Sequence, residues 1–164
     1  MAASELYSLY HSPKPYLTLE DGLQALDTLR SRNITVGAIS NFDNRLHDIV
    51  PSLGLNKYLQ FVVTSEDAKS SKPEEQIFEF ALNKSGLKNL EPDEILHIGI
   101  GSSYNLFTLI LAVPGDDIDN DYWGARTMCW NSLLLDRWGG GYTTIPEEHV
   151  IQNIMDVFSK TSLE

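Results

Sequence analysis

The chain contains very little cysteine: Cys129 is the only one in 164 residues. A single thiol excludes an intrachain disulfide and a metal centre built on several cysteines, and it favours a reducing, cytoplasmic location. Long apolar runs are also missing. The N-terminus has no apolar core of signal-peptide length, and the longest apolar run, residues 106–113, is far too short to span a bilayer. We therefore expect a cytoplasmic protein with no membrane partner.

Basic residues are scarce as well. The sequence has 12 Lys and Arg against 23 Asp and Glu, which gives a formal net charge of −11. Repulsion between these carboxylates and phosphate groups argues against nucleic acid and anionic membranes as general partners. The hydrophobic share of 42% is ordinary for a globular protein, and the length is sufficient for one domain with its own core.

Helices and short buried strands alternate along the chain. Apolar residues at helical spacing predict helices over residues 19–31, 44–53, 74–85 and 145–160. Short apolar runs predict strands over residues 34–40, 61–65, 94–99 and 130–136, and a polar loop over 66–73. This alternation is typical of an α/β fold, and we expect a Rossmann-like, mostly parallel sheet with flanking helices.

Polar residues that could carry chemistry follow the predicted strands. In folds of this class the functional groups gather at the carboxyl edge of the sheet, which selects Ser40–Asn41, Lys72 and the acidic loop 116–121. A hydroxyl and an amide donate to oxyanions, an ammonium suits phosphate or a carboxylate, and clustered carboxylates suit Mg²⁺. Together they predict phosphoryl chemistry. Taken singly, each has a simpler interpretation: a helix cap, a solvated lysine and a solvated turn.

Three stretches carry a family resemblance: VGAISNFDNRL (36–46), VVTSEDAKSSKPEEQIFEFAL (62–82) and GDDIDNDYWGAR (115–126). In sequence and in order they resemble the second, third and fourth motifs of the haloacid dehalogenase-like (HAD-like) hydrolase superfamily. The resemblance covers roughly residues 17–99 and 115–158. It implies a HAD-like core and an ancestral Mg²⁺-dependent phosphatase that acts on a small phosphorylated molecule.

The resemblance also implies residue roles. Ser40 would contact the phosphoryl group with Asn41 beside it, and Lys72 would balance the charge of the nucleophile and the phosphate. Asp116 would be a Mg²⁺ ligand, supported by Asp121. These five residues are the site that the sequence predicts.

The beginning of the chain departs from the family pattern. Family members start with a strand that ends in Asp-x-Asp, whose first Asp is the nucleophile, and a helical cap follows. No such strand precedes Ser40 here, and residues 1–18 resemble the end of a cap. We expect a cap remnant over 1–18 and a core over 19–160 that lacks its first central strand and its nucleophile. This would make the chain a truncated, catalytically inactive isoform.

A second departure lies between the third predicted strand and the acidic loop. Without residues 100–115, ILHIG would run directly into DDIDNDYWGAR, as in the family. We interpret residues 100–115 as an insertion, and a retained intron or an alternative splice segment as its origin. Its apolar part favours an antiparallel strand beside residues 95–99, and a hairpin of that kind would carry Asp116 away from the site.

Two further functions stay open on the sequence alone. A receiver-like phospho-acceptor module also combines a Ser or Thr, a Lys-Pro pair and an acidic pocket. A non-enzymatic binding or regulatory fragment is the other alternative, because a missing central strand would leave apolar surface available for self-association.

Overall fold

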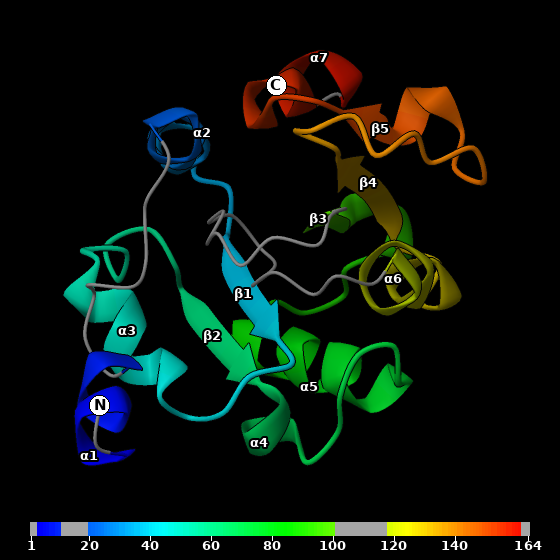
Figure 1. Cartoon of the computed structure of the whole chain (residues 1–164). Helices are drawn as coiled ribbons and strands as arrows, with labels where there is room; N and C mark the ends of the chain where they lie inside the picture. Colours follow the sequence, from blue (N-terminus) through cyan, green and yellow to red (C-terminus); the bar gives the residue numbers. More distant parts are fainter. Residues whose placement is uncertain (1–2, 11–19, 101–117, 162–164) are drawn as a thin grey trace.

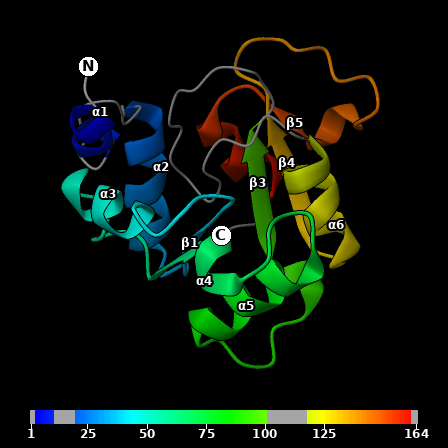
Figure 2. The same cartoon turned by 60° about the horizontal axis from the view of Figure 1, so that its bottom comes forward.

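Two small parallel sheets form the centre of the computed structural model, which describes residues 3–10, 20–100 and 118–161. Strand β1 (Gly37–Ser40) pairs with β2 (Phe61–Thr64), with Ser40 opposite Thr64. Strand β4 (Asn131–Leu135) lies between β3 (Leu96–Ile100) and β5 (Val150–Ile151). All of these pairings are parallel. Figures 1 and 2 show the two groups of strands, with helices on the outside.

The helices connect and cover these strands. They are α1 (Ala3–Tyr10), α2 (Glu20–Ser31), α3 (Leu46–Ser52), α4 (Ser65–Ala68), α5 (Glu75–Ser85), α6 (Gly124–Thr127) and α7 (Val157–Lys160). Short 3₁₀ turns are η1 (Pro92–Glu94), η3 (Glu147–His149) and η4 (Ile154–Asp156), and η2 (Asp119–Trp123) is a π-helical turn. The predicted α/β class with parallel strands and flanking helices is confirmed. In the described part of the chain, no helix is long and apolar enough to cross a bilayer.

The core has one apolar layer on each face of the strands. Alternate residues of a strand point to opposite faces, so Ala38 packs into the layer that contains α2, while Ile39 packs into the layer that contains α5 and α6. The first layer also receives Ile98 of β3 and Leu133 of β4, so it runs beneath both sheets. Burial of these side chains holds the two sheets together although no strand pair joins them in the described residues.

The predicted helix over 145–160 is wrong. In its place the chain forms η3, then β5, then η4 and α7. The β-branched pair Val150–Ile151 extends the sheet beside Leu134 and Leu135 of β4. Asn153 then accepts a hydrogen bond from the Met155 amide at 2.8 Å and starts a new turn. Tertiary pairing with β4 thus overrides the helical spacing of the apolar residues.

The loop predicted over 66–73 also contains regular structure. Thr64 accepts a hydrogen bond from the Asp67 amide at 3.0 Å, and Asp67 accepts one from the Thr64 amide, which together form a capping box. This cap starts the short helix α4, so the polar segment after β2 begins as a turn of helix. The insertion predicted at 100–115, with its antiparallel strand, falls almost wholly outside the described residues; Ile100 still belongs to β3.

Candidate active site

A buried ion pair marks the carboxyl end of the strands. The Lys72 ammonium donates to Oδ1 of Asp121, and both side chains are 1% exposed. Lys72 lies in the loop between α4 and α5, whereas Asp121 lies in η2, so the pair joins segments from the two halves of the chain. Burial alone would raise the pKa of Asp121, but the Lys72 charge and the His97 hydrogen bond outweigh it and hold that pKa below its ordinary value. Asp121 is therefore a carboxylate at neutral pH.

His97 is the third member of this buried group. Its Nε2 lies 3.1 Å from Oδ1 of Asp121, and its ring stands edge-on to Phe78 with 5.7 Å between centroids. Burial lowers the pKa of His97, and the nearby Lys72 charge acts in the same direction against the pull of Asp121. His97 is consequently a neutral imidazole, and the carboxylate fixes the tautomer that donates from Nε2.

Sequence reasoning did not select His97 as a site residue. A signal for it exists, because it is the one polar residue in the run ILHIG and must be buried if that strand is covered on both faces. A buried polar ring needs a partner, but the partner, Asp121, is far along the chain and is not recognisable from the strand itself.

Asn41 holds the backbone of Lys72. The Asn41 side-chain amide donates to the Lys72 carbonyl at 2.9 Å, and the Lys72 amide donates to Asn41 Oδ1 at 2.7 Å. This two-bond clamp ties the end of β1 to the loop that carries the ammonium. Asn41 is thus a positioning residue for Lys72 in this structure. Its predicted place beside a phosphoryl group stays a prediction.

Ser40 ends β1 next to this clamp. Its side chain is buried, with 1% of the residue exposed, and its hydroxyl has no hydrogen-bond partner among the described residues. Oδ2 of Asp121 is likewise buried without a partner in that part of the chain. A buried hydroxyl and a carboxylate oxygen that lack partners carry a desolvation cost, which is a common mark of a site kept for a ligand.

Gly99 explains how Asp121 reaches the end of β3. A β-carbon placed on Gly99 would lie 2.5 Å from the β-carbon of Asp121, which is closer than real side chains approach. Only glycine therefore lets η2 pass this near to the strand. The site thus depends on the backbone of β3 as well as on the polar side chains.

The described residues do not by themselves form a magnesium site. Mg²⁺ requires several oxygen ligands, and Asp121 supplies one free carboxylate oxygen beside the ammonium of Lys72. No cluster of three or more His, Cys, Asp or Glu side chains suited to a metal occurs in the described ranges. Asp116, the predicted ligand, lies outside the described residues. The Mg²⁺ prediction for this chain therefore depends on Asp116.

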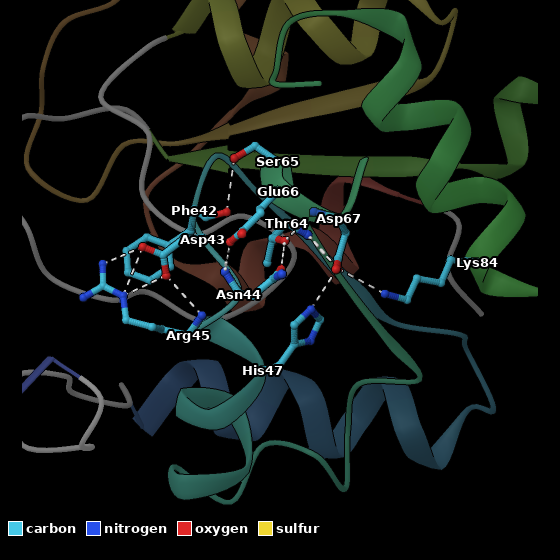
Figure 3. Close-up of polar contacts among 10 residues, drawn as sticks. All are labelled: Phe42, Asp43, Asn44, Arg45, His47, Thr64, Ser65, Glu66, Asp67 and Lys84. Carbon is cyan, nitrogen blue, oxygen red and sulfur yellow. Dashed lines mark hydrogen bonds and ion pairs between the residues drawn. The ribbon is translucent and has the colours of Figure 1, made fainter. Parts of the chain in front are cut away.

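A second polar cluster joins the segment after β1 to α4 and α5 (Figure 3). Asn44 Oδ1 accepts from the Thr64 hydroxyl at 2.8 Å, and the Asn44 amide donates to Glu66 at 2.9 Å. His47 lies 2.8 Å from Asp67, which also pairs with Lys84 at 3.2 Å. These contacts hold the segment that follows Ser40 and Asn41 against α4 and α5.

Comparisons with known proteins fit this geometry. A family model described as haloacid dehalogenase-like hydrolase matches residues 3–99, which is more than half of the chain. The "Rhythmically expressed gene 2 protein" of Drosophila melanogaster is 30% identical over 170 residues, covering 98% of this chain and 59% of the relative. Human "Haloacid dehalogenase-like hydrolase domain-containing protein 3" is 37% identical over 133 residues, covering 81% of this chain and 45% of the relative.

Solved structures share the fold at lower identity. A HAD phosphatase from Thermococcus onnurineus superimposes with a TM-score of 0.68 at 20% identity, covering 86% of this chain and 56% of that one. The putative HAD-hydrolase YfnB from Bacillus subtilis, solved bound to magnesium, gives 0.62 at 13% identity, covering 86% and 53%. The chain thus spans about half the length of the relatives that it matches. It belongs to the haloacid dehalogenase-like hydrolase family.

Proposed function

We propose that this chain is a phosphatase-type member of the family whose catalytic site is incomplete, so that the chain binds phosphate or Mg²⁺ weakly and does not hydrolyse phosphate esters by itself. The observation that carries the proposal is the Lys72–Asp121 pair. The ammonium that would meet a substrate phosphate is buried and bound to a carboxylate of the same chain. A substrate would have to break a buried ion pair before it could reach Lys72.

The chemistry of the site still supports a phosphorylated ligand. Lys72 supplies a fixed positive charge, and Ser40 supplies a hydroxyl without a partner in the described residues. Donors of this kind stabilise phosphoryl oxygens. The solved structures that share the fold include a HAD phosphatase and a putative HAD-hydrolase bound to magnesium, which favours an ancestral Mg²⁺-dependent phosphatase. Hydrolysis through an aspartyl-phosphate would need an attacking carboxylate next to both groups. In the described part of the chain, the carboxylate that contacts Lys72 is Asp121.

Asp121 is a poor substitute for that nucleophile. Its Oδ1 is held by Lys72 and His97, and the residue is fully buried. A nucleophile must reach the phosphorus atom in line with the leaving group, and this requires an accessible oxygen. We therefore assign Asp121 the role of charge partner for Lys72. The cytoplasmic location remains a prediction that accompanies this proposal.

A turnover assay tests the proposal. The 164-residue chain is incubated with Mg²⁺ and p-nitrophenyl phosphate beside the variants Lys72→Ala and Lys88→Ala; Lys88 is an exposed lysine outside the site. We expect all three proteins to release no more nitrophenol than a blank without protein. Turnover in the parent and in Lys88→Ala that disappears in Lys72→Ala would overturn the proposal. Calorimetric titration with inorganic phosphate should give a dissociation constant no tighter than about 1 mM.

A further inference from the structure

A cavity of about 690 Å³ lies beside the amino-terminal half of β4. Its lining comes from residues 131–133 of β4, from Glu148 and His149 of η3, from residues 159–161 at the end of α7 and from Arg126 of α6. We call it the edge cavity. Because the strands are parallel, it lies at the opposite end of the sheet from Lys72 and Asp121. Its volume is within the usual range for ligand pockets.

The backbone of Ser132 faces the edge cavity. Asp136 donates its amide to β5 at 2.8 Å, and alternation along the strand turns the backbone of Ser132 to the same side. The pairing of β4 with β5 begins only at Leu134 and Val150, so no described strand lies beside Ser132 there. The His149 amide, just before β5, donates to a carbonyl of its own turn at 2.9 Å. The edge of β4 therefore presents one amide and one carbonyl of Ser132 to the cavity.

The side chain of Ser132 adds a third polar group to the cavity. Ser132 is 3% exposed, and its hydroxyl has no hydrogen-bond partner among the described residues. The side chain lies on the same face of β4 as Leu134, which packs against Tyr122 of η2. A buried hydroxyl without a partner costs stability, and a ligand in the cavity would remove that cost.

Charges of both signs surround these groups. Arg126 and Lys160 lie on opposite sides of β4, because α6 packs into one core layer and α7 into the other. Burial raises the pKa of Tyr122, the Arg126 charge opposes this shift and the Glu148 charge adds to it, so both charges lie near that hydroxyl. Within the described ranges, Arg126, Lys160 and Glu148 form no ion pair. Both signs are therefore available to a ligand.

We propose that the edge cavity binds a free α-amino acid, whose carboxylate accepts from the amide and hydroxyl of Ser132 and whose ammonium donates to the Ser132 carbonyl. Two residues of an antiparallel pair exchange their N–H and C=O bonds in this way, and an α-amino acid carries both groups on one carbon. Arg126 and Lys160 strengthen the bonds to the carboxylate, and Glu148 strengthens those to the ammonium. A dianion such as phosphate fits less well, because carboxylates line the same cavity.

The rest of the lining indicates the kind of side chain. Asn131, Ser159 and Thr161 contribute an amide and two hydroxyls, which suit an uncharged polar side chain. L-Glutamine is therefore the probe. The proposal does not depend on whether Lys72 and Asp121 act on phosphate.

A residue-resolved titration tests the binding. L-Glutamine is added to the 164-residue chain and amide chemical shifts are followed by NMR. We expect saturable shifts at Ser132, Leu133 and His149 with a dissociation constant of about 1 mM or tighter. The amides of Ser40 and Asn41, at the other end of the sheet, should not shift. If no saturable shift is seen at Ser132 with about 20 mM L-glutamine, the proposal is wrong.

Three other probes separate an amino acid from simpler ligands. N-acetyl-L-glutamine lacks the ammonium and L-glutamine amide lacks the carboxylate, so each should bind at least about tenfold more weakly than L-glutamine. Inorganic phosphate should also bind at least about tenfold more weakly. Equal affinity for the acetylated compound or for phosphate would mean a plain anion site, and equal affinity for the amide would mean that the carboxylate is not recognised. Each of these results contradicts the proposal.

Substitutions connect the binding to the named residues. Ser132→Ala should lower the affinity for L-glutamine about threefold to tenfold without lowering the urea midpoint of unfolding, because the hydroxyl has no partner in the described chain. Arg126→Gln and Glu148→Gln should each lower the affinity at least about threefold. Lys88→Ala, an exposed lysine away from the cavity, is the control and should bind like the parent. Unchanged affinity in all three cavity variants would refute the assignment.

The end of the chain is the remaining alternative occupant. Residues 162–164, which lie outside the described ranges, directly follow Thr161 of the cavity lining. A variant with Ser162→Gly, Leu163→Gly and Glu164→Gly keeps the chain length and removes these side chains. We expect it to bind L-glutamine with the affinity of the parent. Binding that appears only in this variant would place the tail in the edge cavity and would overturn the proposal.

Discussion

Removing the ammonium of Lys72 should strongly destabilise the protein. In Lys72→Met the buried carboxylate of Asp121 keeps His97 as its hydrogen-bond donor but loses its counter-charge. Breaking a buried ion pair on one side typically costs about 3–5 kcal/mol, which is a large part of the ~5–15 kcal/mol that stabilises a domain. Asp121→Asn should cost a similar amount, because it leaves the ammonium unpaired. The double variant should recover much of the loss, since both charges are gone.

Urea unfolding followed by circular dichroism measures these free energies, and the four proteins form a double-mutant cycle. We expect a coupling energy between the two residues of at least about 2 kcal/mol. Lys84→Ala is the matched control, because its ammonium pairs with Asp67 at 3.2 Å and its side chain is 37% exposed. That variant should cost less than about 1 kcal/mol. If Lys72→Met and Asp121→Asn each lower the free energy of unfolding by less than about 1 kcal/mol, and if these losses are additive, the buried pair and the proposal that depends on it are refuted.

Three further changes test the surroundings of this pair. Asn41→Ala removes both bonds to the Lys72 backbone and should lower the free energy of unfolding by about 1–3 kcal/mol in the same urea assay. Gly99→Ala places a β-carbon against Asp121 and should destabilise by about 1–3 kcal/mol, seen as a lower melting temperature; an unchanged value would contradict the close approach of η2. Because burial lowers the pKa of His97 in the folded chain, the unfolded state takes up the proton first, so stability should fall as the pH drops below about 6.5. His97→Gln, which retains a donor, should lose that part of the pH dependence.

Local pattern was sufficient to predict most helices and strands, and with them the positions of Ser40 and Lys72 in the fold. The end of β1 at Ser40 and the loop that carries Lys72 lie where periodicity and turn residues predict them. Each of these features depends on residues that are neighbours in the sequence. The last predicted helix failed because Val150 and Ile151 pair with β4, a contact that is distant along the chain. His97 was missed for the same reason. Its burial can be inferred from the apolar residues beside it in the sequence, but its partner Asp121 is distant along the chain. The clamp between Asn41 and Lys72 likewise depends on a fold contact that no spacing in the sequence predicts.

The ion pair between Lys72 and Asp121, which resembles part of a phosphate site, also joins the two halves of the fold. Asn41 connects Lys72 to β1, and Asp121 connects Lys72 to η2 and, through His97, to β3, so a continuous chain of polar contacts links the carboxyl ends of β1 and β3. At the other end the connection is apolar, through the layer that contains α2 and Ile98. Without a strand pair between β1 and β3 in the described residues, these two connections join the two sheets. Lys72 therefore acts as a structural clamp in this chain, and a phosphate bound to it would have to weaken that clamp.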